Sequence, residues 1–189
     1  LNFAYMGGFI VVPQMLETGL GFTSSHIGWL VIARPLTFSI TAPLASMVTM
    51  RIGERRSGVI GAIGIIVSML LLSSVSAGSS DIVIALGLAM SGVGFGIAGP
   101  ALTGLVANAV DDETVGVAGA MQQLLSQMGA VLGSTVMISI HEMTAGSTTV
   151  VRSYGLALLA GAVTASVAAV LAAKLQSTDR SGTRSEATA

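Results

Sequence analysis

The sequence has 189 residues, of which 52% are hydrophobic and only 9% are charged, with a net charge of −1 and no cysteine. Ordinary soluble domains carry about 25% charged residues, so this composition is typical of a protein that lies in a lipid bilayer. The lack of cysteine excludes a disulfide scaffold and a thiolate metal site. No basic nucleic-acid footprint is present, and we expect no cofactor, no metal and no nucleic-acid partner.

Six apolar segments meet or approach the roughly 20 residues that a helix needs to cross a bilayer core. None has a charged face at helical period, and no ten-residue alternating segments of a β-barrel occur. The predicted fold is all-α, a polytopic membrane protein with six transmembrane helices. The segments lie at about residues 1–16, 27–50, 58–77, 82–110, 115–140 and 153–175.

The ends of the chain give two further expectations. Leu1 begins an apolar stretch with no charged region and no cleavage site before it, so we expect an N-terminally truncated chain rather than a signal peptide. We predict one six-helix bundle over residues 1–175. Residues 176–189 are rich in Ser, Thr and Arg, and a segment without an apolar pattern is predicted to be a disordered tail.

The positive charges predict the orientation of the helices. With alternate loops on opposite sides, only Arg152 falls on one side. By the positive-inside rule the other side is cytoplasmic, which places both ends of the chain in the cytoplasm and the protein in the plasma (cytoplasmic) membrane. The residues on that side are Arg51, Arg55, Arg56, Lys174, Arg180 and Arg184.

Arg34 is the one charge well inside a predicted transmembrane segment. It lies roughly 10 Å from the outer end at 1.5 Å per residue, where an arginine costs about 2.5–3.5 kcal/mol on insertion scales. Two interpretations remain open. Arg34 could line a cavity, where it would attract an anionic group or tune the proton affinity of a partner. Alternatively it has a structural role, snorkelling outward or bonding carbonyls freed by Pro35.

Other polar side chains within the segments are also candidates for a substrate cavity. Each could bond a substrate or a neighbouring helix, and bonding between helices is the commoner fate. Gln123 and Gln127 share a helix face. The candidates besides Arg34 are Tyr5 and Gln14 in the first segment, Asn108 in the fourth, and Gln122, Gln123 and Gln127 in the fifth.

Glycine and proline predict close packing and bending of the helices. Small residues four apart, such as Gly92 and Gly96, let helix backbones approach closely in lipid. The run GFGIAG at residues 94–99 has no preceding strand and no following Lys-Ser/Thr, so we interpret it as helix packing rather than a phosphate loop. Proline frees a carbonyl and can kink a helix. The predicted kinks are Pro35, Pro43, Gly99 and Pro100.

Two stretches of the sequence resemble a known family. Pro43-Leu44-Ala45 followed by RIGERR at residues 51–56 resembles the basic loop between the second and third helices of each half of a major facilitator superfamily transporter. GVGFGIAGPALTGLVANAV at residues 92–110 and GVAGAMQQLLSQMGAVLGS at 116–134 are similar to the C-terminal half of the fourteen-helix drug:proton antiporter branch. Ser46 and Met50 depart from the Gly and Asp that are usual in the loop.

The resemblance implies a gating loop and a function. The gating residues would be Arg51, Gly53, Arg55 and Arg56. The implied activity is secondary active transport by alternating access, in which drugs or small amphipathic metabolites leave the cell in exchange for protons. The implied partners are the lipid bilayer, the missing N-terminal half of the transporter, a small-molecule substrate and protons.

Alternative functions remain open at this point. A sugar or organic-anion transporter is the alternative within the same class, and a six-helix membrane scaffold without transport is the alternative outside it. Enzyme chemistry is not expected. His141-Glu142 lacks the second His of a zinc helix, and Ser91 lacks the Gly two positions earlier that an intramembrane serine protease has.

Overall fold

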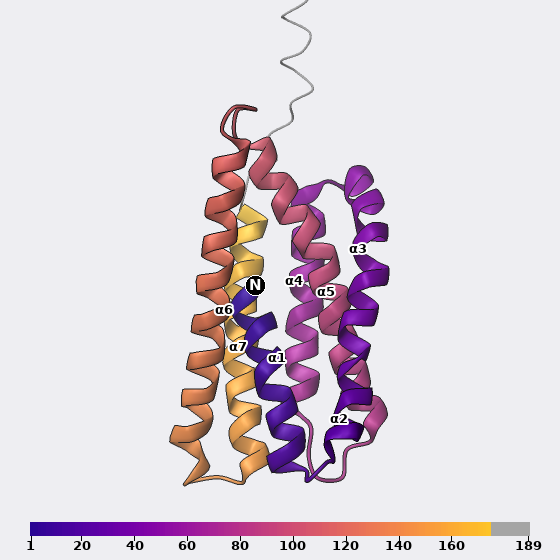
Figure 1. Ribbon diagram of the computed structural model, residues 1–189, viewed down its shortest axis with the longest axis vertical. Helices are drawn as coiled ribbons and strands as arrows, with labels where there is room; N and C mark the ends of the chain where they lie inside the picture. The colour runs from indigo at the N-terminus through magenta and orange to yellow at the C-terminus, as the bar shows by residue number, and fades with distance from the viewer. Residues whose placement is uncertain (175–189) are drawn as a thin grey trace, which may run out of the picture.

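A computed structural model describes residues 1–174 as a single bundle of helices that run along one common axis (Figure 1). The all-α prediction is confirmed for these residues. The predicted tail over 176–189 lies outside the described residues. The elements are α1 (Asn2–Gln14), the π-helical turn η1 (Met15–Gly19), α2 (Ser24–Val31), α3 (Ala33–Ile52), α4 (Glu54–Ser73), α5 (Asp81–Asn108), α6 (Val115–Ala145) and α7 (Val150–Lys174).

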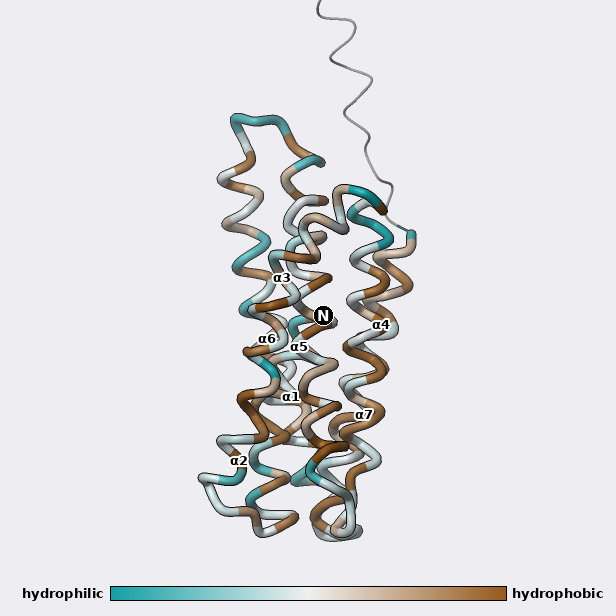
Figure 2. Tube along the Cα trace, turned by 90° about the vertical axis from the view of Figure 1, so that its right-hand side faces the viewer, coloured by the Kyte–Doolittle hydropathy of each residue, from teal (hydrophilic) through white to brown (hydrophobic). Residues whose placement is uncertain are grey.

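Five spans in the described residues are long and apolar enough to cross a membrane. Helices α2 and α3 together form the first of them, over Ser24–Ile52, and α4 to α7 form the others. Helix α1 has 13 residues and is shorter than a full span. Hydrophobic residues dominate the length of the bundle, while hydrophilic residues gather near its two ends (Figure 2). We call these ends the Gly53 end, at the top of Figure 1, and the His26 end, at the bottom.

Two prolines coincide with irregular helix geometry. Pro35 has no N–H to bond the carbonyl of Val31, and the helix is interrupted at Ile32, between α2 and α3. Pro13 lies in the last turn of α1, directly before the π-helical turn η1. Pro and π-turns are the usual positions of helix bends. By contrast, α3 continues through Pro43 and α5 continues through Pro100.

The predicted loop from Arg51 to Ser57 is wrong, because a single residue separates α3 from α4. Gly53 has φ +87° and ψ 152°, a conformation that is essentially restricted to glycine, so the chain changes direction there without a longer loop. Arg51 belongs to the last turn of α3, and Arg55 and Arg56 belong to the first turn of α4. Three of the predicted gating residues therefore lie on two helix ends, and the fourth, Gly53, forms the turn between them.

Two other predicted boundaries are also corrected. Helix α4 ends at Ser73 rather than near residue 77. Helix α6 continues to Ala145, so His141 lies on a helix and not in the predicted loop over 141–152. Only residues 146–149 separate α6 from α7, and Arg152 belongs to the first turn of α7.

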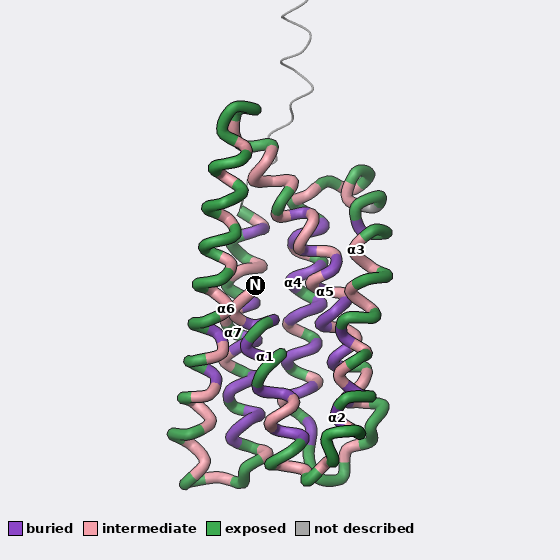
Figure 3. Tube along the Cα trace, viewed as in Figure 1, coloured by how far each residue is buried: buried purple, intermediate pink, exposed green. Residues whose placement is uncertain are grey.

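Glycines bring the helices in the middle of the bundle into close contact. A Cβ added to Gly61 of α4 would lie 2.5 Å from the carbonyl oxygen of Gly94 and 2.6 Å from the amide nitrogen of Ala98 on α5. On the other side of α4, a Cβ at Gly155 of α7 would lie 2.9 Å from the carbonyl oxygen of Ser73. Buried residues accordingly concentrate on α4, α5 and α7, and also on the short helix α1 (Figure 3).

Candidate functional site

Arg34 is the most deeply buried charge in the described residues, with a side chain only 1% exposed. It extends from the first turn of α3, about 15 Å from the start of α2 at 1.5 Å per residue. Its Nε donates to Ser91 Oγ of α5 at 2.7 Å, and its Nη1 donates to the Tyr5 carbonyl oxygen of α1 at 3.4 Å. The Nη2 group has no hydrogen-bond partner. Arg34 therefore connects three helices and retains an unsatisfied N–H group.

The Arg34 guanidinium also makes cation–π contacts with two aromatic rings. The Cζ atom lies 5.0 Å from the centre of the Tyr5 ring and 5.6 Å from that of Phe9. Both distances are within the range in which a cation is attracted to a ring face. No carboxylate approaches Arg34, since Asp and Glu residues in the described helices occupy first or last turns or η1.

The hydroxyl of Ser91 is fixed between two partners. It accepts from Arg34 and donates to the Leu88 carbonyl oxygen at 2.6 Å. The next residue is Gly92, where an added Cβ would collide with the Arg34 carbonyl oxygen and Thr37 Oγ1. Thr37 in turn donates to the Ala89 carbonyl oxygen at 3.0 Å. Glycine at position 92 is therefore what lets α3 approach α5 closely enough for the Arg34–Ser91 bond.

Phe95 of α5 connects this cluster to an adjacent cleft. Its ring stacks on Tyr5 with centres 4.1 Å apart and an angle of 10° between the planes. Phe38 of α3 packs against the same ring at 6.0 Å. We call Arg34, Tyr5, Phe9, Ser91 and Phe95 the arginine cluster.

The cleft has a volume of about 490 Å³ and lies between α1, α5 and α6. Leu1, the first residue of the sequence, forms part of its wall. Its walls combine aromatic, aliphatic and amide side chains, as is usual for sites that bind small organic molecules. The lining residues are Leu1, Asn2, Phe3, Phe95, Gly99, Leu102, Thr103, Gln122, Gln123, Leu125, Ser126 and Gly129.

The structure brings together only some of the predicted cavity residues. Arg34 and Tyr5 meet in the arginine cluster, and Gln122 and Gln123 line the cleft, where Gln122 Nε2 donates to Thr103 Oγ1 at 3.2 Å. Gln127 is exposed and does not line the cleft. The half-buried Gln14 lies at the end of α1, where its carbonyl accepts from Thr18 Oγ1.

Asn108 does not belong to the cleft. It lies at the Gly53 end of α5, and its Nδ2 donates to Glu54 Oε1 of α4 at 2.8 Å. At the same end the Arg55 guanidinium donates to the Ala173 carbonyl oxygen of α7. These two contacts tie the start of α4 to the ends of α5 and α7.

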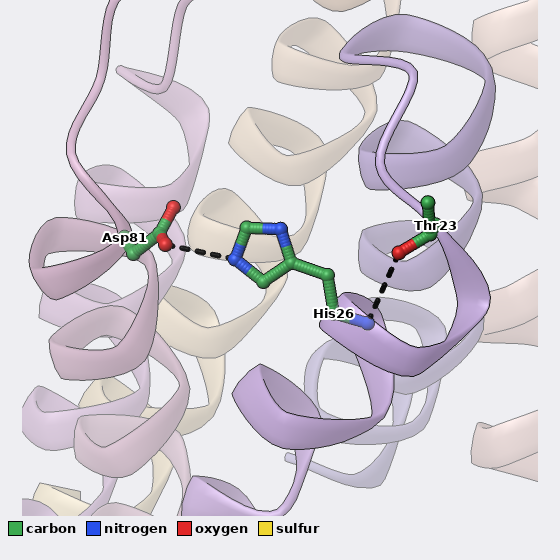
Figure 4. Close-up of polar contacts among 3 residues, drawn as sticks. All are labelled: Thr23, His26 and Asp81. Carbon is green, nitrogen blue, oxygen red and sulfur yellow. Dashed lines mark hydrogen bonds and ion pairs between the residues drawn. The ribbon is translucent and has the colours of Figure 1, made fainter.

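Sequence reasoning missed a set of contacts at the His26 end. His26 of α2 contacts Asp81 of α5, with 2.8 Å between Nε2 and Oδ2, while the Thr23 hydroxyl accepts from the His26 amide and caps α2 (Figure 4). The His26 ring also stacks on Phe22. The His26–Asp81 contact joins residues 55 positions apart in the sequence, so no local pattern could have predicted it.

A second histidine cluster joins α6, α7 and η1. The His141 ring stacks on Tyr154 at 3.6 Å, and its Nδ1 lies 2.7 Å from Ser153 Oγ. The Tyr154 hydroxyl is 3.1 Å from Thr18 Oγ1 of η1. No group of three His, Asp or Glu side chains within residues 1–174 could hold a metal ion.

Comparison with known proteins identifies the family to which this helical protein belongs. The sequence matches the Major Facilitator Superfamily over residues 1–188. The chain belongs to the major facilitator superfamily. Together with the five spans in residues 1–174 that are long and apolar enough to cross a membrane, this membership makes it a multi-pass membrane protein of that superfamily.

Two multidrug resistance or transporter proteins are similar to the chain at low identity. It is 26% identical over 138 residues to the multidrug resistance protein Stp of Mycobacterium tuberculosis, covering 73% of this chain and 26% of that protein. It is 21% identical over 147 residues to the multidrug transporter protein MdtP of Bacillus subtilis, covering 78% of this chain and 27% of that protein. The chain thus matches about a quarter of the length of these relatives.

The positions that depart from the usual superfamily loop have identifiable surroundings. Ser46 Oγ donates to the Pro43 carbonyl oxygen at 2.7 Å, within α3. Met50 is 82% exposed, so other side chains of residues 1–174 do not cover it. Neither residue places a charge near the turn at Gly53.

Proposed function

We propose that this chain is the C-terminal six-helix half of a secondary active transporter that works by alternating access. The proposed activity is export of drugs or small amphipathic metabolites in exchange for protons. Superfamily membership and the names of the relatives Stp and MdtP support this proposal. In such folds the substrate site lies near the middle of the bilayer, at the interface between repeats.

The arginine cluster is the observation that carries the proposal. Arg34 is buried within a membrane span, retains an unbonded Nη2 and has no acidic partner in the described residues. Ionisable groups at such positions in membrane proteins usually belong to substrate or ion pathways. Phe95 joins this charge to a cleft that contains two glutamines. Charge, aromatic surface and amide groups suit an amphipathic molecule.

The coupling acid is expected in the upstream half of the transporter. Acidic residues of the described helices lie near helix ends rather than in the middle of the spans. In this proposal a carboxylate from the other half approaches the arginine cluster during the transport cycle. The proposed orientation places the Gly53 end in the cytoplasm, where Arg51, Arg55 and Arg56 would help to close the inner side.

An organic-anion transporter is the second candidate function. Arg34 favours it, because a buried guanidinium attracts carboxylate and phosphate groups and disfavours cationic drugs. Sugars have no charge that would use this residue. The two candidates therefore differ in the charge of the transported molecule.

Transport by the full-length protein tests the proposal. Cells that lack other pumps would be loaded with fluorescent cationic, neutral and anionic compounds, with and without a proton uncoupler. We expect the protein to lower the accumulation of at least one class and the uncoupler to abolish this effect. If accumulation of every class stays unchanged at confirmed membrane levels, the transporter proposal fails and a scaffold role is favoured.

Two substitutions locate the site within the bundle. Arg34→Met should reduce transport about tenfold or more, since hydrogen bonds to charged groups contribute ~1.5–3 kcal/mol. Gln123→Leu, in the cleft wall, should raise the apparent KM, and Gln127→Leu is its matched control on an exposed position of the same helix. Unchanged transport in Arg34→Met and Gln123→Leu would remove both residues from the site.

A further inference from the structure

A groove between α4 and α7 at the Gly53 end is separate from the arginine cluster and its cleft. It has a volume of about 530 Å³. Two arginines form one part of its wall, and aliphatic side chains form the other. The lining residues are Arg55, Arg56, Val59 and Ile60 of α4 and Ala173 of α7.

The positive charge of this groove is not neutralised by the neighbouring carboxylate. Glu54 precedes the arginines in α4, but its Oε1 accepts from Asn108 and its side chain packs beside Gly104 of α5. Glu54 therefore faces α5 rather than the groove. Arg55 donates to the neutral Ala173 carbonyl oxygen, and it has no ion pair with a carboxylate of residues 1–174. Arg56 is exposed, and no carboxylate of residues 1–174 pairs with it.

Apolar surface continues from the groove along the two helices. Both α4 and α7 present exposed aliphatic residues three or four apart, with the adjacent Val170 and Leu171 as the exception, so each set forms one stripe along its helix. Arg56 is in register with the stripe of α4, and Lys174 ends the stripe of α7. The stripes consist of Ile60, Ile63, Val67 and Leu70 on α4, and Val163, Val167, Val170 and Leu171 on α7.

This order of groups matches the chemistry of an anionic phospholipid. Arginine binds phosphate oxygens through paired N–H groups, and basic pockets between transmembrane helices on the cytoplasmic side bind anionic lipid headgroups. We propose that a phospholipid with a net negative headgroup binds here, with its phosphate on Arg55 and Arg56 and an acyl chain along Val59 and Ile60. The inference rests on the orientation proposed above, which places this groove at the inner leaflet.

A second acyl chain has a place on the other side of Ile60. A small apolar pocket of about 150 Å³ lies between α3, α4 and α5 and also has Ile60 in its wall. Its remaining lining residues are Thr41, Leu44, Ala45, Ile52 and Ile97. Ile60 thus forms a ridge between two apolar depressions, over which the two chains of one lipid separate.

Native mass spectrometry of the full-length protein tests the proposal. The purified protein would be exchanged into micelles that contain equal amounts of phosphatidylglycerol and phosphatidylcholine. We expect bound phosphatidylglycerol to exceed bound phosphatidylcholine. The preference should fall roughly fivefold for each groove arginine that is neutralised. Because binding in micelles needs neither transport nor a defined orientation, failure here is distinguishable from failure of the transporter proposal.

Four variants distinguish binding in the groove from general attraction of the lipid to basic residues. Arg56→Gln is the principal variant, because it leaves the Arg55–Ala173 contact in place, and Arg55→Gln/Arg56→Gln should remove the preference. Arg51→Gln removes the same charge at the same end, on α3 and outside the groove, so it should leave the preference unchanged. Deletion of residues 176–189 should also leave it unchanged.

Three results would overturn the proposal. One is equal retention of the two lipids by the unaltered protein. Another is an equal loss of preference in Arg51→Gln and Arg56→Gln, which would show attraction to a basic surface without a defined site. The third is loss of the preference on deletion of residues 176–189 alone, which would place the binding site outside the groove.

Discussion

The bundle contains a tightly packed part and an open part. In the most apolar stretches of α4 and α5, 44% of residues are buried, and in α7 33% are buried. The corresponding values are 12% for the α2–α3 span and 11% for α6. Figure 3 shows the same contrast, with burial concentrated in the middle of the bundle and exposure on the outward sides of α3 and α6.

The difference separates a closely packed scaffold of α4, α5 and α7 from two more open helices, and α5 of the scaffold also contributes Ser91 and Phe95 to the site. Helix α4 contacts α5 at Gly61, Gly94 and Ala98 and contacts α7 at Gly155, which fixes the separation of these helices. Helices α3 and α6 expose long apolar surfaces and contribute Arg34, Gln122 and Gln123 to the arginine cluster and the cleft. In an alternating-access transporter, such surfaces are available to lipid or to the other half of the protein. Substitutions in the two parts should therefore differ sharply in how much they destabilise the protein.

The largest effect is expected where α4 meets α5. A Cβ at Gly94 would lie 2.7 Å from the Gly61 carbonyl oxygen and 2.7 Å from the Ile65 amide nitrogen. Backbone atoms cannot move aside as a flexible side chain can. Gly94→Leu should therefore cost more than the ~1–3 kcal/mol that is usual for overpacking. Little folded full-length protein should be recovered in detergent, as judged by size-exclusion chromatography.

Gly116→Leu is the matched control in the open part. A Cβ at Gly116 of α6 would meet no atom within 4 Å, so the variant should be recovered at the level of the unaltered protein. Equal losses in the two variants would contradict the division into scaffold and open helices.

The sequence predicted the scaffold better than the ends of its helices. Hydropathy indicated the membrane spans, and the predicted close approach at Gly92 and Gly96 is present as contact between α5 and α3. The predicted helix boundaries were wrong near Arg55, Arg56 and His141. Charged and polar residues end an apolar stretch there, but the helix continues through them. Gly53 ends α3 instead. Because its φ is positive, this one residue is enough to turn the chain into α4.

The surroundings of the candidate site could not be predicted from the sequence. Arg34 was recognisable as a costly charge, but its partners Ser91 and Tyr5 lie 57 and 29 positions away. Only the packing of α1 and α5 against α3 brings them together. The same holds for Phe95, which connects the cluster to the cleft although no local motif marks it as a binding residue.

A smaller effect is expected within the arginine cluster. Ser91→Ala would leave Arg34 Nε buried without an acceptor, which should destabilise the protein by ~1–3 kcal/mol. Arg34→Met should cost less or be stabilising, since apolar residues of similar volume often replace buried charges without loss. The double variant should recover most of the stability lost in Ser91→Ala. Thermal unfolding of the full-length protein in detergent measures all three.

The double variant tests whether Ser91 and Arg34 stabilise the protein through their mutual hydrogen bond. If its loss of stability equals the sum of the single losses, then Ser91 does not act through Arg34. The arginine would then be held mainly by the rings of Tyr5 and Phe9, and the cluster would belong to the open part of the molecule rather than joining α3 to the scaffold.

The smallest effect is expected on the outward side of α6. A Cβ at Gly119 meets no atom within 4 Å, and alanine is favoured over glycine within a helix by about 0.5–1 kcal/mol, so Gly119→Ala should slightly raise the unfolding temperature. Gly133→Ala on the same helix should lower it, because its Cβ would collide with the Phe3 carbonyl group. If Gly119→Ala instead lowers the unfolding temperature of the full-length protein, this side of α6 packs closely against a part of the protein outside residues 1–174. In the transporter proposed above, the exposed side of α6 would then be an interface with the other half rather than a surface in contact with lipid.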